Sequence, residues 1–423
     1  MSQRDFDVVV FGATGLTGRH VAAYLQERAA ASGLRWAAAG RDEAKLARVL
    51  SEEGASEAST LLADVEQADS LRDVASRATV VLNLVGPYTP YGRPVIEACV
   101  AGGCHYADLT GEIPFVRGVL DVLDQPAREA GVKVAQVCGF EALPPDLATL
   151  LAADAARERY DEPLQSVDVE VSITAPPGLP RPSDAISGGT LQSVLAIAAS
   201  ERSDLIADPA ALITDAQLAD AVRSVSPIAI APRHAHGDGV IAPMAPAPFI
   251  NPAVVHRSAA LAAAAAGVEP MPFRYREGMV LGGPPATLPL RWGLAGAMSA
   301  TQAGLRSFAS AAPSTRRRLT SALSRIVPGS GYGPKGERLQ AWRWQLRVFA
   351  RTLGGRELEV SIDADGHPGY LATARMLGEL GILLAEDGAT PDVAGCVTPA
   401  IALGSASAPR FAHAGVRFSV SAP

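Results

Sequence analysis

The first third of the chain alternates short apolar runs with longer amphipathic stretches. Val, Ala and Leu dominate the runs, and the runs end in turns that carry glycine, proline or a charge. Such runs are typical of strands buried on both faces of a parallel sheet, and the stretches between them have the spacing of helices. The predicted strands are Phe6–Phe11, Arg35–Ala39, Thr60–Ala63, Thr79–Val85, His105–Asp108 and Gly131–Val137. Strand and helix in alternation predict an α/β fold with a doubly wound parallel sheet of the Rossmann type.

A different pattern follows residue 150. Residues Gln165–Thr174, Arg343–Phe349 and Arg356–Ile362 alternate apolar and polar positions. This period of two is typical of strands with one solvent-facing side. Helices are expected at Ser187–Ser200 and at Tyr370–Ala385, where apolar residues recur at helical spacing. These elements predict a second, α+β domain in which helices cover a mixed or antiparallel sheet.

The composition of the 423 residues excludes several classes of protein. Hydrophobic residues make up 48% and charged residues 19%, which excludes a mostly disordered chain. The net charge of −7 argues against a protein that binds nucleic acid by neutralising its phosphates. No run of 18 apolar residues occurs, so we expect no transmembrane segment, and the N-terminus shows no signal-peptide core.

Cysteine and histidine are too scattered to indicate a disulfide framework or a zinc ribbon. The four cysteines contain no CxxC pair, so a reducing cytoplasm is the simplest compartment. His234 and His236 lie on the same side of an extended segment, and Asp238 is the third ligand that a metal would need. No further histidine or cysteine lies near them in the sequence. We therefore predict no metal site.

A glycine-rich turn joins the first strand to the first helix and reads Gly12-Ala-Thr-Gly15-Leu-Thr-Gly18. In a dinucleotide-binding fold the first glycine permits a tight turn, and the second lets backbone N–H groups approach a pyrophosphate. The third lets the helix pack closely on the strand. An ordinary turn is the alternative, but a strand before the motif and a helix after it favour the dinucleotide site.

The end of the second strand favours NADP over NAD. An NAD site usually has an acidic residue here for the ribose 2′-hydroxyl, but this chain has Gly40 and then Arg41, whose guanidinium matches a 2′-phosphate. The alternative is that Arg41 lies in solvent while Asp42 caps the next helix, and both can hold. Further along, Asp64 is placed to meet the adenine amino group. The segment Asn83–Tyr88 falls at the carboxyl edge of the sheet, where ligands bind.

Two motifs are absent from the sequence. None of the eight tyrosines has a lysine four residues later, so the Tyr/Lys pair of short-chain dehydrogenases is missing. No Gly-x-Ser-x-Gly elbow occurs, so hydrolase chemistry has little support.

Several segments, in order, resemble the saccharopine dehydrogenase-like oxidoreductases, especially the bacterial branch called trans-acting enoyl reductases. They are residues 12–18, 39–41, 83–92, 106–112, 138–146, 187–190, 273–277 and 370–379. Two positions depart from the expected pattern: Glu141 stands where aspartate is expected, and Pro145 where serine is usual.

The resemblance implies a second domain inserted into the first. We expect an NADP-binding Rossmann domain at residues 1–150, completed by 368–423, and an α+β substrate or dimerisation domain at 151–367. With the motifs above, it implies that NADP(H) contacts Gly12, Ala13, Thr14, Gly15, Leu16, Thr17, Gly18, Gly40, Arg41, Asp64, Asn83, Val85, Gly86, Pro87, Tyr88, Gly139 and Phe140.

The candidates for acid–base chemistry lie on the loops after the strands. Tyr88 is a candidate proton donor, although a tyrosine beside Pro87 also suits a turn that shields the cofactor. Asp108 and Glu112 are candidate acids or bases, or else turn and capping residues. Two more carboxylates, Glu141 and Asp146, flank the loop after the strand at 131–137.

Two other features bear on partners. The apolar stretch Gly278–Ala312 suits a substrate pocket, a lid, a membrane-surface contact or ordinary core. The basic run Arg316–Arg318 suits a solvated helix face or an anionic partner such as a lipid headgroup or carrier protein. A homodimer is also compatible with the second domain.

Three hypotheses follow. The leading one is an NADPH-dependent reductase of a conjugated C=C in an apolar lipid or polyketide intermediate. The second is C=N reduction or its reversal on an amino-acid conjugate, which needs paired cations for the substrate carboxylates. The third is a non-catalytic NADP-binding regulatory or lipid-associated protein.

Overall fold

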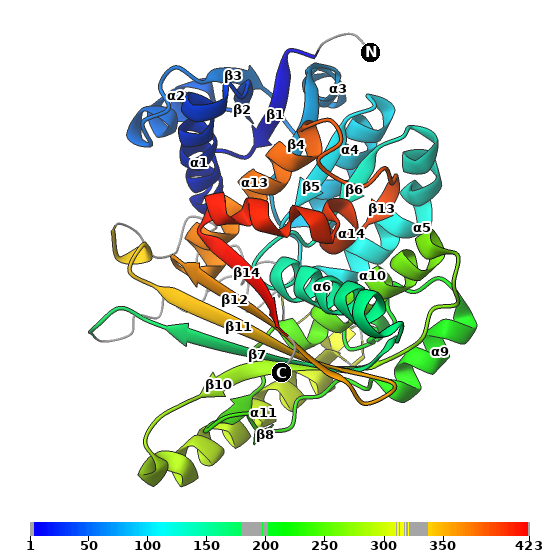
Figure 1. Ribbon diagram of the computed structural model, residues 1–423. Coiled ribbons are helices and arrows are strands. Elements are labelled where there is room, and N and C mark those ends of the chain that lie inside the picture. Colours follow the sequence, from blue (N-terminus) through cyan, green and yellow to red (C-terminus); the bar gives the residue numbers. More distant parts are fainter. Residues whose placement is uncertain are drawn as a thin grey trace.

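Two seven-stranded sheets form the framework of the protein, one in the upper and one in the lower half of Figure 1. The structure is a computed structural model that describes residues 4–178, 202–309 and 337–421, together with 197, 311, 312, 314–316, 318 and 320. The predicted helix at 187–200 lies outside the described residues, apart from residue 197, and the basic run at 316–318 is described only in part.

All strands of the first sheet are parallel, in the order β13-β6-β5-β4-β1-β2-β3. Their bounds are β1 Phe6–Phe11, β2 Trp36–Gly40, β3 Ser59–Leu62, β4 Ala78–Asn83, β5 His105–Asp108, β6 Lys133–Ala135 and β13 Gly395–Val397. The strand order runs outward in both directions from β1 and β4, as in a doubly wound fold. The Rossmann-type sheet predicted from the sequence is therefore confirmed.

Helices cover both faces of this sheet, because alternate strand residues pack in opposite directions. Val9 and Phe11 pack with α3 (Ala68–Arg77), α4 (Tyr88–Ala101) and α5 (Ile113–Glu129). Val8 and Val10 pack on the other face, where the helices are α1 Leu16–Ser32, α2 Glu43–Glu52, α6 Leu143–Tyr160 and α13 Thr373–Ala385. The predicted helix at 370–385 is thus present. It begins as a π-helical turn, η5 (Pro368–Ala372), and packs back on the first sheet as expected.

The second sheet is mixed, in the order β14-β12-β11-β7-β10-β9-β8. Strands β7 and β10 are parallel and the other neighbours are antiparallel. The bounds are β7 Leu164–Thr174, β8 Arg233–His234, β9 Val240–Ala242, β10 Arg274–Leu281, β11 Arg343–Thr352, β12 Glu357–Asp365 and β14 Val416–Ser421. Helix α6 covers one face of β11 and β12. The predicted α+β organisation of this part is confirmed.

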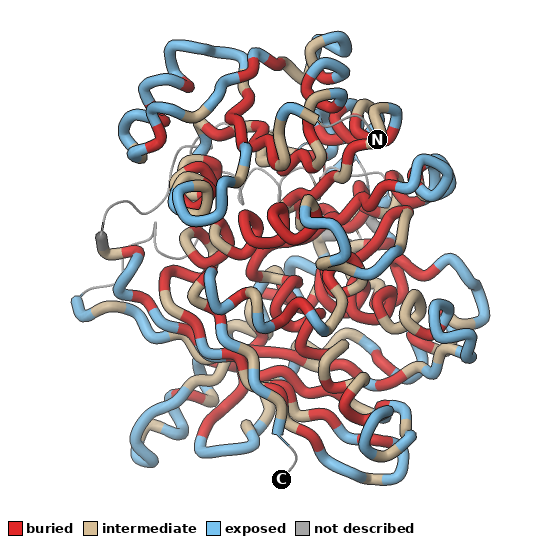
Figure 2. The backbone as a smooth tube through the Cα atoms, turned by 45° about the horizontal axis from the view of Figure 1, so that its top comes forward, coloured by how far each residue is buried: buried red, intermediate tan, exposed pale blue. Residues whose placement is uncertain are grey.

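The remaining described helices lie around the second sheet and at the junction of the two sheets. They are α9 Ala216–Val225, α10 Asn251–Ala266, α11 Leu288–Ala309 and α14 Pro399–Leu403, with short helices η1 Ser203–Leu205, η2 Ala247–Phe249, η3 Pro285–Thr287, η4 Glu337–Leu339 and η6 Ser405–Ala414. Buried residues lie in both sheets (Figure 2), and one hydrophobic cluster contains residues of both.

The C-terminal segment contributes to both sheets. Strand β13 joins the first sheet beside β6, whereas β14 pairs with β12 in the second. The segment expected to complete the first domain therefore supplies α13 and β13 to it and ends in the other sheet. The domain boundaries at residues 150 and 368 stay a prediction.

Candidate active site

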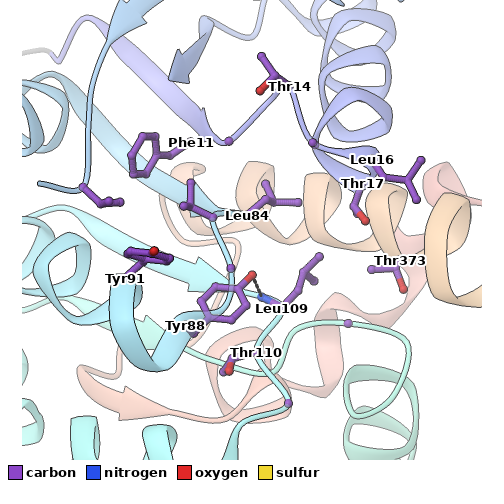
Figure 3. A pocket seen from close by; sticks show the side chains of 18 of the residues that line it. Phe11, Thr14, Leu16, Thr17, Leu84, Tyr88, Tyr91, Leu109, Thr110 and Thr373 are labelled. Atoms are coloured by element: carbon purple, nitrogen blue, oxygen red, sulfur yellow. Dashed lines mark hydrogen bonds between the residues drawn. The ribbon is translucent and has the colours of Figure 1, made fainter. Parts of the chain in front are cut away.

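A cavity of about 570 Å³ opens at the carboxyl edge of the first sheet. Because the strand order is β6-β5-β4-β1-β2-β3, the ends of β3 and β6 lie on opposite sides of it. We call one side the glycine-loop end; it is lined by Gly12, Thr14, Gly15, Leu16, Thr17, Gly18, Gly40, Arg41, Lys45, Asp64 and Glu66. We call the other the inner end; it is lined by Leu109, Thr110, Gly111, Val137, Gly139, Glu141, Ile197, Pro246, Ile250, Gly369, Tyr370 and Thr373. Leu84 and Tyr88, labelled in Figure 3, lie between them, and Val85 and Gly86 of the same loop also line the cavity.

The glycine loop has the geometry that a pyrophosphate needs. Gly12 has φ of +92°, a conformation that residues with a Cβ rarely adopt. A Cβ on Gly18 would lie 2.3 Å from the carbonyl oxygen of Gly12, so only glycine lets α1 approach the loop this closely. Gly15 is the N-cap of α1, which has no side-chain cap and no acidic residue in its first turn. The amides at this helix end are therefore oriented for an anion in the cavity.

Charged side chains surround the glycine-loop end beyond the loop itself. Arg41 and Lys45 both line the cavity and are exposed. Asp42 accepts a hydrogen bond from the backbone N–H of Lys45 at 2.9 Å and so caps α2. Both roles considered for this segment are compatible, because the acid caps the helix while the two cations line the cavity. Asp64 lines the cavity too, and its Oδ1 accepts the N–H of Glu66 at 3.1 Å.

Tyr88 forms the wall between the two ends. Its hydroxyl donates to the carbonyl oxygen of Asn83 at 3.1 Å and accepts the N–H of Leu109 at 3.3 Å, the bond drawn in Figure 3. Burial, followed by the charge of Asp108, raises the pKa of Tyr88 well above its ordinary value. The two bonds of this hydroxyl join the ends of β4 and β5. Because its proton is already donated to a carbonyl oxygen, the arrangement favours a role for Tyr88 in shaping the cavity over a role as proton donor.

Asp108 lies behind the cavity wall rather than on it. Its Oδ1 accepts the N–H groups of Thr110 at 3.0 Å and Val137 at 3.2 Å. Its Oδ2 accepts the hydroxyl of Tyr106 at 3.0 Å and the amide of Gln136 at 3.3 Å. Burial raises the pKa of Asp108 to about 6, and these four bonds oppose the shift.

The bonds to Asp108 also explain why β6 is shorter than predicted. The chain leaves the strand after Ala135, and Val137 has φ of 63°, which is rare for a β-branched residue. The Asp108 carboxylate accepts the Val137 N–H, which therefore does not continue the strand ladder. A strained valine is thus held on the cavity wall by a buried carboxylate.

Glu112 is fully buried and caps a helix. Its carboxylate accepts the N–H of Tyr88 at 3.0 Å, and the N–H and hydroxyl of Thr89 at 2.8 and 2.5 Å. These bonds support the start of α4 at Tyr88. Among the described residues, neither Asp108 nor Glu112 lines the cavity, so the geometry favours positioning roles over the acid–base roles considered for them.

Four residues of the predicted cofactor set are not among the described residues that line the cavity. Ala13 is buried, and Asn83 holds the loop by accepting the N–H of Val85 at 3.0 Å. Phe140 packs edge-on against Trp344 with ring centroids 4.9 Å apart. Pro87 follows a cis peptide bond from Gly86. The other members of the set all line the cavity.

Sequence reasoning missed most of the inner end. Leu109, Thr110, Val137, Tyr370 and Thr373 come from three separate stretches of the chain and carry no motif of cofactor chemistry. Two signals were available: Gly139, a member of the predicted cofactor set, and Glu141, a carboxyl group on a loop after a strand. Both line the cavity.

The other candidates lie elsewhere. Nδ1 of His236 is 2.8 Å from Glu170, and its ring stacks on Phe349, whereas His234 contacts Trp292. Across the described residues, no group of three His, Cys, Asp or Glu side chains could hold a metal ion. The described part of Gly278–Ala312 forms the end of β10, η3 and the whole of α11, and none of its residues lines this cavity. None of the helices described is long and apolar enough to cross a membrane.

Comparison with known proteins explains the arrangement. Residues 8–134 match the saccharopine dehydrogenase NADP-binding domain family. A trans-acting enoyl reductase of Mycobacterium ulcerans is 32% identical over 441 residues, covering 99% of each chain. The chain belongs to the trans-acting enoyl reductase family, within the saccharopine dehydrogenase-like oxidoreductases.

Other relatives agree with this placement in the trans-acting enoyl reductase family. A trans-acting enoyl reductase of Mycobacterium tuberculosis is 31% identical, covering 98% of this chain and 97% of its own. The apo saccharopine dehydrogenase (L-Glu forming) of Saccharomyces cerevisiae has the same fold, with a TM-score of 0.50 and 14% identity over 98% of this chain and 99% of that one. The first domain of this family member is an NADP-binding domain, as predicted.

Proposed function

We propose that this protein is an NADPH-dependent reductase of a conjugated C=C bond in a neutral, apolar acyl substrate. The relatives named above carry the activity in their names. The observation that carries the proposal here is the contrast within one cavity. Its glycine-loop end has an anion cradle and two cations, and its inner end, over the residues described, has no lysine or arginine.

The residues present fit the cofactor for two reasons. A Cβ on Gly18 would collide with the glycine loop, so only glycine keeps the loop close to α1, and the first backbone N–H groups of α1 have no side-chain cap and can bind a phosphate. The glycine loop would hold the pyrophosphate, Arg41 and Lys45 the 2′-phosphate, and Asp64 the adenine. When bound, NADPH supplies the hydride. The protein's own part is to exclude water, to orient the substrate and to provide a proton.

The inner end selects the substrate. Leu109, Val137, Pro246 and Ile250 give it an apolar lining, while Thr110 offers a hydroxyl group. Such a surface suits an acyl chain with one polar carbonyl group. The alternative, C=N chemistry on an amino-acid conjugate, needs cations for the substrate carboxylates, and the described lining of this end supplies none.

The experiment is to follow NADPH oxidation with a panel of α,β-unsaturated acyl thioesters and ketones, beside saccharopine-like imines. We expect turnover with the unsaturated acyl compounds, with a saturated acyl product. Turnover of imines alone would contradict the proposal, and tight NADPH binding without turnover of any compound would favour the regulatory alternative.

The finer parts of the functional assignment are also proposals. We infer that the enzyme acts in lipid metabolism in the cytoplasm, which the four free, buried cysteines support. An apolar acyl chain is poorly soluble, so presentation on a carrier protein is the form of substrate that we favour. Peripheral membrane contact and a homodimer stay predictions from the sequence.

A further inference from the structure

Glu141 is the only carboxyl group among the described residues that line the inner end of the cavity. It lies in the turn between β6 and α6, two residues before the helix begins at Leu143. Its side chain is partly exposed and lines the cavity. A titratable oxygen is therefore present where an acyl substrate would lie.

The backbone around Glu141 is fixed from two sides. Nδ2 of Asn251, at the start of α10, donates to the Glu141 carbonyl oxygen at 2.5 Å and to Oε2 of Glu277 at 2.8 Å. On the other side the carboxyl group folds over Gly139, where a Cβ would lie 3.2 Å from Oε2 of Glu141. The turn is thus tied to the second sheet, and a glycine leaves room for the carboxyl group.

The other acidic groups near the cavity are occupied. Asp108 accepts four hydrogen bonds and Glu112 caps α4, as described above. The Tyr88 hydroxyl donates to a backbone carbonyl. The carboxyl group of Glu141, by contrast, accepts no hydrogen bond from another side chain among the described residues, and only its own backbone N–H opposes the rise of its pKa.

We propose that Glu141 is the proton donor of the reaction, an inference that rests on the proposed function. Hydride from NADPH adds to the β-carbon, and the C=C electron pair moves onto the carbonyl group to give an enolate. The enolate re-forms the carbonyl, and its α-carbon takes the proton from the Glu141 carboxyl group. The products are a saturated acyl group, NADP⁺ and the Glu141 carboxylate, which regains a proton from water.

The electrostatics agree with a carboxyl group that holds its proton. Burial raises the pKa of Glu141, and the hydrogen bond from its own backbone lowers it less. Other titratable groups on the elements around it are Tyr88 on α4, Asp108 on β5, Asp146 on α6, Glu277 on β10 and Tyr370 in η5. Burial also raises the pKa of Asp108 to about 6 and those of Asp146 and Glu277 to about 7. A pH profile is therefore assigned to Glu141 only by comparison with a variant.

The test is Glu141→Gln, which keeps the shape of the side chain and removes the acid. We expect kcat with an enoyl thioester to fall by about a hundredfold or more, in the range of general acid catalysis, with the NADPH Kd unchanged within about twofold. Glu141→Asp should recover part of the rate. The matched control is Glu158→Gln, an exposed glutamate on α6, the helix that follows Glu141, which should keep the wild-type rate.

Two further readouts separate proton donation from a structural effect. The wild-type kcat should fall as pH rises through the pKa of Glu141, because the donor must be protonated, and this alkaline limb should be absent in Glu141→Gln. With an α-methyl enoyl thioester, the wild type should give one configuration at the α-carbon. The variant should give a mixture, because water then delivers the proton without a fixed direction.

The outcomes distinguish this inference from the proposed function. A wild type that reduces enoyl thioesters, with a Glu141→Gln variant of equal rate and equal stereochemistry, would overturn the Glu141 assignment alone. A wild type that turns over only imines would overturn the proposed function, and the assignment with it.

Discussion

The two ends of the cavity are built in different ways. The glycine-loop end is mainly backbone: Gly12, Gly15 and Gly18 lie within seven consecutive residues, and their chemistry is that of exposed amides. The inner end is mainly side chains, and it takes Val137, Glu141, Ile250 and Tyr370 from separate parts of the chain.

This difference suggests that the two ends have separate tasks, one in binding NADPH and the other in the reduction of the substrate. A backbone cradle recognises a phosphate whatever the rest of the ligand is, so the glycine-loop end governs the affinity for the cofactor. The inner end is where we propose that the acyl substrate lies, so it should govern rate and selectivity. Variants at the first end should therefore change the NADPH Kd, and variants at the second should change kcat.

Gly18→Ala is expected to have the largest effect on binding. The new Cβ would lie 2.3 Å from the Gly12 carbonyl oxygen and 2.9 Å from Cα of Ala13, so α1 must move away from the loop. We expect the NADPH Kd, measured by calorimetric titration, to rise by about a hundredfold or more. Gly118→Ala on α5 is the control, because a Cβ there meets no atom within 4 Å. A Gly18→Ala protein that binds NADPH with the wild-type Kd would show that the loop does not hold the pyrophosphate.

Arg41→Ala should have a smaller and selective effect. Losing charged hydrogen bonds to a 2′-phosphate costs about 1.5–3 kcal/mol, which corresponds to an NADPH Kd roughly 10–100 times higher. The NADH Kd should hardly change, since NADH has no 2′-phosphate. Arg48→Ala, an exposed arginine on α2 outside the cavity, serves as the control. If the ratio of the two affinities is the same in wild type and Arg41→Ala, then Arg41 does not select NADP.

Asp108→Asn should lower kcat less than Glu141→Gln does, although the side chain of Asp108 is more deeply buried than that of Glu141. The folded protein raises the pKa of Asp108 from 3.8 to about 6, so folding favours its protonated form. Its contribution to the free energy of unfolding is therefore full below about pH 4. It falls by about 1.4 kcal/mol per pH unit as pH rises towards 6.

The measurement for Asp108 is the difference between the wild-type and Asp108→Asn unfolding free energies from pH 4 to 7. We expect this difference to change with pH over that window, while kcat stays within about tenfold of wild type and the NADPH Kd is unchanged. A loss of kcat as large as that of Glu141→Gln, with no pH-dependent difference in stability, would instead identify Asp108 as the acid.

The fold was largely predictable because its signals are local. The six predicted strands of the first sheet are short runs that need no knowledge of their partners, whereas the seventh, β13, was missed. The glycine spacing of residues 12–18 specifies a turn by itself. The alternation in residues 165–174 likewise predicted β7. The final strand β14 was missed as part of the second sheet, because its pairing with β12 depends on where the chain returns in space.

The candidate site was predictable at one end only. Asp108 and Glu112 look like catalytic carboxylates in the sequence, since both follow a strand, but sequence does not reveal that backbone N–H groups of Val137 and Tyr88 occupy them. Tyr370 and Ile250 reach the inner end through tertiary packing alone. Charge and glycine patterns are visible along a chain, whereas the direction of a side chain is settled by its neighbours.

The most direct test of the account follows the transferred hydrogen. The wild-type enzyme is given an enoyl thioester and NADPH that carries deuterium at C4 of the nicotinamide, on each face in turn, and the product is examined by mass spectrometry and NMR. The account predicts that one of the two cofactors places deuterium on the β-carbon of a saturated thioester, while the α-carbon takes its hydrogen from solvent. Deuterium at the carbonyl carbon, or no transfer from either cofactor, would contradict the claim that this cavity reduces a conjugated C=C bond.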